Sequence, residues 1–274
     1  IPTLEGRAII NEHQILSFFL LNENKMNTDQ TLAQMRTLKL SGMAQAYQTM
    51  LQMPLNEQLT TDLLIAQLIE AEALSRNHKK MVTNIKAAKF RYQAAIEEIE
   101  FLPQRNLDKN AILRLANTSF IKRGENVLIT GSTGCGKSYI ATALGYQACQ
   151  MGFKVGYYSM SKLLQRLQLS KGDGSLMKEL AKIEKMQLLI LDDWGMHPLD
   201  SQTKLYLLQI IEDRHGKCST VITSQLPVAA WFEYINEPTL ADAILDRLLQ
   251  QAHRLEIQGE SMRKRKKLEE KQIQ

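Results

Sequence analysis

An eight-residue motif between a strand-like run and a helix-like run constrains the fold of this chain more than any other feature. Residues 131–138 read Gly-Ser-Thr-Gly-Cys-Gly-Lys-Ser and match G-x-x-x-x-G-K-[ST] at every position. The apolar run 126–130 precedes the motif, and the run 139–151 has the composition of a helix. A strand entering the motif and a helix leaving it are the context that a phosphate-binding loop requires. The sequence therefore predicts a nucleotide site in an α/β fold.

Each residue type in the motif suits one part of a magnesium-bound triphosphate. The glycines allow a tight turn and a close backbone approach, so that successive N–H groups can face phosphate oxygens. Lys137 is expected to reach the β and γ phosphates, the Ser138 hydroxyl to ligate Mg²⁺, and the next helix to add its positive dipole end. Cys135 occupies a variable position, which favours a small filler residue over a redox group. The predicted ATP contacts are Gly131, Ser132, Thr133, Gly134, Cys135, Gly136, Lys137, Ser138 and Tyr139.

A second segment has the pattern of a Walker B strand. Residues 187–193 read Gln-Leu-Leu-Ile-Leu-Asp-Asp, and four consecutive apolar residues suit a strand buried on both faces of a parallel sheet. Such strands present functional groups at their carboxyl ends. Asp192 is therefore the predicted metal ligand, and Asp193 is predicted to orient or deprotonate the attacking water. The alternative, two solvated turn carboxylates, would be preferred only without the phosphate-binding loop.

Composition and charge narrow the class of protein. The chain has 274 residues, enough for one or two domains, and a net charge of +5, which is compatible with an anionic partner. Its 3 cysteines show no metal-ligand spacing and are too few for a disulfide framework, so a reducing compartment, the cytoplasm, is expected. The chain begins at Ile1, and residues 1–25 are expected to be a remnant outside the native protein, or disordered. The apolar stretch 15–21 is too short to span a bilayer, and no membrane role is expected.

Hydrophobic spacing divides the rest of the chain. Residues 26–103 carry apolar side chains at helical spacing, which predicts a helical N-terminal domain that binds DNA or a partner and ends near Pro103. Residues 104–257 alternate strand-like and helix-like runs, which predicts a parallel sheet covered on both faces. The expected strands are 126–130, 154–158, 187–191, 219–223 and 253–257. Residues 258–274 form a basic tail that is too short for a full helical lid.

The fourth predicted strand ends in a polar run, Thr223-Ser224-Gln225. Parallel strands deliver their carboxyl ends to one edge of the sheet, so a side chain here could touch the γ-phosphate or the attacking water. Ser224 is the predicted catalytic contact. The alternative is that the Ser224 hydroxyl caps the helix that follows.

The assembled pattern resembles an AAA+ ATPase, and three segments resemble the IstB-like transposition helper proteins, which are close relatives of the DnaC helicase loaders. These segments are 126–131, 189–195 and 243–248, and the resemblance extends from about Met26 to Lys267. It implies an ATP-dependent protein that assembles as a homo-oligomer on duplex DNA, helps to choose the insertion target and stimulates a partner transposase.

The resemblance also implies that ATP lies between neighbouring subunits and that an arginine of one subunit completes the site of the next. Arg247, on a predicted helix after the fourth strand, is the predicted finger, and Arg214 is the runner-up. Without the resemblance, a salt bridge between Arg247 and Asp246 or Asp242 would be the preferred interpretation. The short tail argues against a sensor arginine on a lid, and Arg263 is the residue that would partly replace it.

Basic residues mark the predicted DNA contacts. The segment 76–91 contains six of them and no acidic residue, and each phosphate that such a cluster neutralises adds about −0.9 to the log–log salt slope. The segment 162–182 adds basic residues between the second and third strands, and the run 263–267 is expected to be a solvated or phosphate-touching tail. A solvated helix face is the alternative for the first group. The predicted contacts are Arg76, Lys79, Lys80, Lys86, Lys89, Arg91, Lys162 and Arg166.

Three other functions compete with a transposition helper. A replicative helicase loader would use the same ATPase core with a helicase-gripping N-terminal domain. A small-molecule kinase would need an acceptor pocket and an arginine-rich lid, and the sequence offers neither. A purely structural DNA-binding protein would leave the intact loop and the paired aspartates unexplained.

Overall fold

The computed structural model describes residues 27–54, 59–259 and 261–262. The chain forms two compact units, residues 1–79 and 80–274, so the division falls within the long helix α3 (Thr61–Ala88) and not near Pro103 as expected. The second unit begins before Pro103 because hydrogen bonds attach the last part of α3 to that unit. The Asn84 side-chain amide donates hydrogen bonds to the carbonyls of Phe153, at 2.9 Å, and Gly152, at 3.3 Å. Residues 1–25 and 263–274, with the predicted remnant, Arg263 and most of the basic tail, lie outside the described residues.

The described part of the first unit is helical, as predicted. It contains a helix over residues 27–37, α2 (Ser41–Met50) and the first part of α3. The buried Glu72 carboxylate of α3 accepts hydrogen bonds from the backbone N–H groups of Gly42, at 2.7 Å, and Met43, at 3.2 Å. A side chain at position 42 would lie 2.4 Å from the Ala71 carbonyl oxygen. Glycine is therefore required where α2 meets α3.

Five parallel strands form the sheet of the second unit, in the order β2-β3-β4-β1-β5. All five were predicted from strand-like runs that alternate with helix-like runs, and each lies within a few residues of its expected position. The observed strands are β1 (Asn126–Gly131), β2 (Val155–Ser159), β3 (Leu188–Trp194), β4 (Ser219–Ser224) and β5 (Ala252–Ile257). β3 extends further than expected, so Asp192 and Asp193 belong to the strand itself. Central strands of this kind are buried on both faces, which explains the continuous apolar runs.

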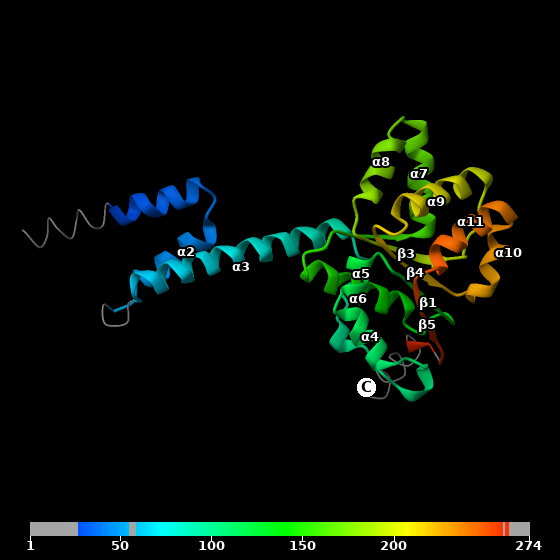
Figure 1. Ribbon diagram of the computed structural model, residues 1–274, viewed down its shortest axis with the longest axis horizontal. Helices are drawn as coiled ribbons and strands as arrows, with labels where there is room; N and C mark the ends of the chain where they lie inside the picture. The colour runs from blue at the N-terminus through cyan, green and yellow to red at the C-terminus, as the bar shows by residue number, and fades with distance from the viewer. Residues whose placement is uncertain (1–26, 55–58, 260, 263–274) are drawn as a thin grey trace, which may run out of the picture. The chain divides into compact units, whose positions relative to one another are not determined.

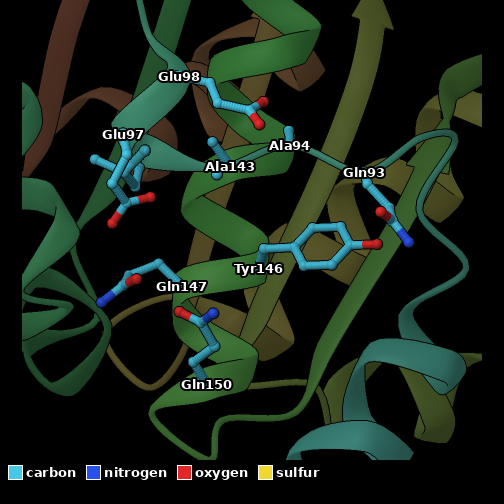
Figure 2. Close-up of a pocket in the computed structure, with 10 residues that line it drawn as sticks. Gln93, Ala94, Glu97, Glu98, Ala143, Tyr146, Gln147 and Gln150 are labelled. Carbon is cyan, nitrogen blue, oxygen red and sulfur yellow. The ribbon is translucent and has the colours of Figure 1, made fainter.

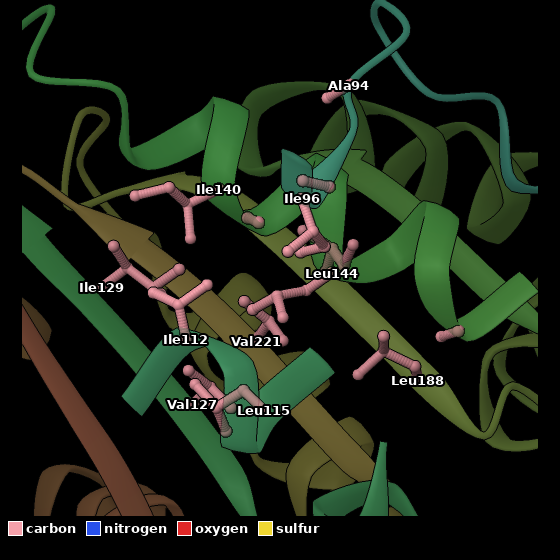
Figure 3. Close-up of a cluster of buried hydrophobic side chains, with 14 of the residues drawn as sticks. Ala94, Ile96, Ile112, Leu115, Val127, Ile129, Ile140, Leu144, Leu188 and Val221 are labelled. Carbon is pink, nitrogen blue, oxygen red and sulfur yellow. The ribbon is translucent and has the colours of Figure 1, made fainter. Parts of the chain in front are cut away.

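Helices cover both faces of this sheet (Figure 1). One face packs against α4 (Lys109–Ala116), α5 (Ser119–Arg123), α6 (Lys137–Gln150) and the short turn η2 (Ile96–Glu98). Figure 3 shows this core, in which Ile112 and Leu144 meet Val127 and Val221. The other face packs against α7 (Met160–Gly172), α8 (Leu176–Glu184), α9 (Ser201–Arg214), α10 (Trp231–Ile235) and α11 (Pro238–Leu249). This three-layer arrangement confirms the predicted α/β class and brings the carboxyl ends of β1, β3 and β4 to one edge.

No helix in the described part of the chain is both long enough and apolar enough to cross a membrane.

Candidate nucleotide site

The phosphate-binding loop follows β1 directly, and its glycines adopt conformations that other residues avoid. Gly131, Gly134 and Gly136 have φ angles of 147°, 83° and 98°. A Cβ at position 131 would also lie 2.1 Å from the carbonyl oxygen of Ile257. An L side chain is strained at these positive φ angles, and at position 131 the Ile257 carbonyl also leaves no room for a Cβ. Glycine is therefore required. α6 begins at Lys137, so the positive end of its dipole faces the loop, as predicted.

Lys137 lies inside the loop. Its side chain is buried, and its ammonium group donates hydrogen bonds to the carbonyls of Gly131 and Ser132, both at 2.8 Å. The charge is therefore placed at the mouth of the loop, where phosphate oxygens could replace these two carbonyl acceptors.

Ser138 and Asp192, the predicted metal ligands, are in direct contact. The Ser138 hydroxyl donates to Asp192 Oδ1 at 2.8 Å, and the Asp192 side chain is fully buried. Thr223 Oγ1 also donates to Oδ1, and the Tyr157 phenol donates to Oδ2. Burial, and then the neighbouring Asp192 charge, raise the pKa of the Tyr157 phenol, so it remains a protonated donor. A hydroxyl beside a carboxylate is an oxygen ligand set that suits Mg²⁺.

Asp193 occupies an irregularity in β3. The pairing of β3 with β4 shifts between Leu191 and Trp194, and Asp193 has a φ of 64°. Its N–H donates to Thr223 Oγ1 at 3.1 Å, and its side chain is only half-buried, unlike that of Asp192. A strained bulge of this kind often lies next to a functional site and re-aims a side chain.

The Ser224 hydroxyl is used locally, which contradicts its predicted contact with phosphate. Ser224 is fully buried, donates to the Trp194 carbonyl at 2.8 Å and accepts from the Leu226 N–H at 3.0 Å. The bond to Leu226 closes a local turn, and Ser224 does not cap a helix either, because the next one, η4 (Val228–Ala230), has Pro227 at its N-cap position. The next residue, Gln225, is joined to the phosphate-binding loop instead, because the Thr133 hydroxyl donates to Gln225 Oε1 at 2.6 Å. The sequence placed Gln225 in the correct polar run but did not distinguish it from Ser224.

Sequence reasoning also missed Arg105, which supports the loop from the segment before β1. The Arg105 guanidinium is buried and donates to the Cys135 carbonyl at 2.7 Å. The segment after β5 meets the same loop, since the Ser132 hydroxyl donates to the Gly259 carbonyl at 3.2 Å and the Met262 N–H donates to the Gly134 carbonyl at 3.0 Å. No local motif marks these contacts.

The predicted finger, Arg247, lies at the other end of the sheet from its own loop. The Asn126 side chain, at the start of β1, donates to the Arg247 carbonyl at 3.4 Å, whereas the loop follows the end of β1. The strand between them spans roughly 16 Å at about 3.3 Å per residue. The Arg247 guanidinium donates to Glu212 of α9 at 3.0 Å, so its ion-pair partner is neither Asp246 nor Asp242. Arg247 is therefore remote from the nucleotide site of its own subunit.

Arg214, the runner-up for the finger, is a structural residue, and that prediction is wrong. Its side chain is only 1% exposed and donates to the carbonyls of Ile183, Met186 and Ser219 at 2.9, 2.6 and 2.5 Å. A guanidinium that satisfies three buried carbonyls cannot reach a neighbouring subunit.

Replacing Arg214 with alanine is expected to lower the free energy of unfolding by about 3 kcal/mol or more, because buried carbonyls lose a charged donor. Urea unfolding followed by circular dichroism would measure this loss. The matched control is Arg247→Ala, which should unfold close to wild type because its ion pair is partly exposed. Equal stability of Arg214→Ala and wild type would contradict the structural role.

The basic residues of segment 76–91 all lie on the surface. Arg76 pairs with Glu72 at 2.7 Å and Lys79 contacts the Ser41 hydroxyl, both within the first unit. The other four, Lys80, Lys86, Lys89 and Arg91, belong to the second unit and are exposed.

The two basic residues predicted near the second strand differ in their surroundings. Lys162 is exposed. Arg166 makes two hydrogen bonds with the Glu179 carboxylate, at 2.6 and 2.8 Å, so its charge is neutralised and ties α7 to α8. The structure therefore disfavours Arg166 as a phosphate contact. Its partner lies 13 residues away in the sequence, across the turn between the two helices.

A pocket of about 340 Å³ lies between residues 93–98 and the outer face of α6 (Figure 2). Tyr146, Gln147 and Gln150 line it from α6, and Glu97 and Glu98 line it from η2. It includes no residue of the phosphate-binding loop, so it is separate from the nucleotide site.

The three-layer fold, the glycine loop ahead of α6 and the paired aspartates of β3 together define a P-loop ATPase of the AAA+ class. The chain belongs to the family of IstB-like ATP-binding proteins, which matches residues 33–270. The insertion-sequence ATP-binding protein y4pL of Sinorhizobium fredii is 42% identical over 234 residues, 85% of this chain and 96% of that protein. The ATP-binding protein of insertion sequence IS1162 from Pseudomonas fluorescens is 38% identical over 203 residues, 74% of this chain and 88% of that protein.

Solved structures support the same fold. The DnaC helicase loader has a TM-score of 0.54 at 20% identity, over 62% of this chain and 100% of that one. The replication initiator DnaA bound to AMPPCP and single-stranded DNA has a TM-score of 0.55 at 17% identity, over 66% of this chain and 56% of that one. The predicted membership of the IstB-like family, the AAA+ core and the ATPase activity are thus confirmed.

Proposed function

We propose that this chain is a transposition helper that binds ATP and Mg²⁺, assembles as a homo-oligomer on duplex DNA and delivers target DNA to a partner transposase. The observation that carries the proposal is the meeting of the phosphate-binding loop with Asp192 and Asp193 at one edge of the sheet. The two relatives described above are named as ATP-binding proteins of insertion sequences, which favours transposition over other uses of this core.

Each group around the loop would make a different contact with the triphosphate. Loop N–H groups and the start of α6 would face the phosphates, and Lys137 would exchange the carbonyls of Gly131 and Ser132 for β- and γ-phosphate oxygens. Ser138 and Asp192 would hold Mg²⁺, which neutralises charge that develops on the phosphate oxygens. Asp193 would orient or deprotonate the attacking water, and Gln225 would take the γ-phosphate contact first assigned to Ser224.

Arg247 would complete the site of a neighbouring subunit. Its distance from its own loop supports a role between subunits, and its partner Glu212 is itself more than half exposed. Because an exposed ion pair is weak, breaking it when subunits assemble would cost little free energy.

The exposed basic residues would make the DNA contacts. Arg166 is excluded from them because it pairs with Glu179. Lys80, Lys86, Lys89, Arg91 and Lys162 are available for phosphate oxygens, and Arg76 and Lys79 could exchange their present partners for phosphate. Contacts of this kind position a duplex without reading its bases.

Lys137→Ala tests the proposed function. The loss of a charged donor to two phosphates is expected to weaken ATP binding at least about 100-fold, and ATP-dependent binding to DNA should be lost with it. Anisotropy of a fluorescent duplex, with and without ATP, measures the second effect. Lys154→Ala, at an exposed position in the same unit, is the matched control.

Unchanged ATP affinity in Lys137→Ala would contradict the loop assignment. If the wild-type protein bound duplex DNA with the same affinity in the presence and absence of ATP, the proposed dependence of DNA binding on ATP would be contradicted. Co-purification with a transposase and with a replicative helicase, tested side by side, would separate the proposal from the helicase-loader alternative.

A further inference from the structure

Tyr157 of β2 makes a contact that the proposed reaction does not yet explain. Its phenol donates a hydrogen bond to Asp192 Oδ2, while Ser138 and Thr223 donate to Oδ1. The Asp192 carboxylate is therefore held by hydroxyl groups on both of its oxygens, and Tyr157 is the donor on Oδ2. The phenol is largely buried, with the residue 8% exposed.

Donors on both oxygens fix the rotation of a carboxylate about its side-chain bond. Donors on Oδ1 alone would leave Oδ2 without compensation in a fully buried position. Groups that contact a metal ligand, and not the metal itself, commonly set the orientation of that ligand. Tyr157 has the geometry of such a group.

The Tyr157 ring is itself held from a distant part of the sequence. Phe90 packs edge-on against Tyr157, with ring centroids 6.2 Å apart, and stacks on Tyr146 of α6 at 4.6 Å. Gly145 leaves room for this ring, since a Cβ there would lie 2.7 Å from Phe90 Cε1. Phe90 follows the last residue of α3 by two positions and lies between Lys89 and Arg91. The segment that carries two of the proposed DNA contacts thus packs against the tyrosine that holds the metal-binding carboxylate.

We propose that Tyr157 is a positioning residue for Asp192, held in place by Phe90, and that it sets the affinity of the nucleotide site for Mg²⁺. This rests on the proposed role of Asp192 as a metal ligand. The inference predicts that loss of the phenol oxygen alone weakens the response to Mg²⁺, while binding of ATP without metal is unaffected.

Tyr157→Phe removes the oxygen and keeps the ring that Phe90 contacts. We expect about 10-fold more Mg²⁺ to be needed for half-maximal binding of N-methylanthraniloyl-ATP, since a lost contact to a metal ligand usually costs 10- to 100-fold in affinity. Binding of the same nucleotide in EDTA should match wild type. The control is Tyr158→Phe, because Tyr158 belongs to the core on the opposite face of the sheet and should leave the Mg²⁺ midpoint unchanged.

A double variant separates positioning from a general loss of structure. If Tyr157 acts through the Asp192 carboxylate, adding Tyr157→Phe to Asp192→Asn should change the Mg²⁺ midpoint less than about 2-fold, because interacting sites are not additive. If Tyr157→Phe alone does not fold, the double variant should still fold, since it contains no uncompensated charge. A double variant that fails to fold would overturn the proposal.

The remaining outcomes separate a failure of the proposed metal site from a failure of the role of Tyr157. A wild-type protein that binds the nucleotide equally in Mg²⁺ and in EDTA would remove the metal assignment itself. A wild type that responds to Mg²⁺, together with a Tyr157→Phe variant of unchanged midpoint, would overturn only the role of Tyr157. Equal weakening with and without Mg²⁺, or the same shift in Tyr158→Phe, would show a structural effect and would also overturn it.

Discussion

Replacing Arg247 with alanine is expected to slow ATP hydrolysis by the assembled protein about 10³-fold or more, while ATP binding is retained. The reason is that, in the proposed assembly, the guanidinium of one subunit would stabilise charge on the phosphoryl group of the next. The position of Arg247, at the far end of β1 from its own loop, leaves it no such role within one subunit. Phosphate release at saturating ATP, together with a nucleotide-binding titration, would measure the two effects separately.

Mixing variants tests whether the site is shared. Lys137→Ala keeps Arg247, and Arg247→Ala keeps an intact loop, so a mixed assembly contains some complete sites and should regain part of the hydrolysis. The matched control is Glu212→Ala, which breaks the ion pair of Arg247 but leaves the arginine in place, and which should hydrolyse ATP nearly as fast as wild type. No rescue in assemblies proven to contain both variants would count against the shared site.

Replacing Asp193 with asparagine is expected to lower kcat about 10²- to 10³-fold while ATP affinity stays within a few-fold of wild type, because general base catalysis contributes roughly this much. Asparagine tolerates the left-handed backbone better than most residues, so the φ of 64° at this position should be preserved. Steady-state kinetics and a binding titration on the same preparation would provide both numbers.

Asp193→Gly is the useful comparison, because it removes the carboxylate and also relieves the backbone strain. Both variants should be slow if the carboxylate is what matters. Wild-type turnover by either variant would remove Asp193 from its proposed role.

Arg214 and Arg247 are alike in local sequence and differ in their tertiary contacts. Arg214 is the last residue of α9 and Arg247 lies in the last turn of α11, and their sequence neighbourhoods do not distinguish a finger from a buried anchor. The difference lies in the partners. Arg214 satisfies carbonyls 5, 28 and 31 residues away, whereas Arg247 pairs with one carboxylate near the surface. Only the packing of α8 and α9 against β4 brings the partners of Arg214 together.

The sequence by itself determined the five strands to within a few residues, the phosphate-binding loop, and the choice of Ser138 and Asp192 as two side chains that should lie together, as they do at 2.8 Å. The central strands and the loop have local signatures, because a strand buried on both faces is a continuous apolar run and a phosphate loop carries glycine at positions of positive φ. Parallel strands then bring their carboxyl ends to one edge whatever their exact register.

The tertiary structure alone decided which side chains meet around the phosphate-binding loop and Asp192. Tyr157, Thr223 and Arg105 reach their partners across 30 to 35 residues of sequence. The Ser224 hydroxyl is bonded to the Trp194 carbonyl, whereas the Gln225 amide oxygen meets the loop at Thr133. A hydrogen bond requires partners within about 3 Å, and strand register and helix packing set that distance. Composition and spacing along the chain contain no such information.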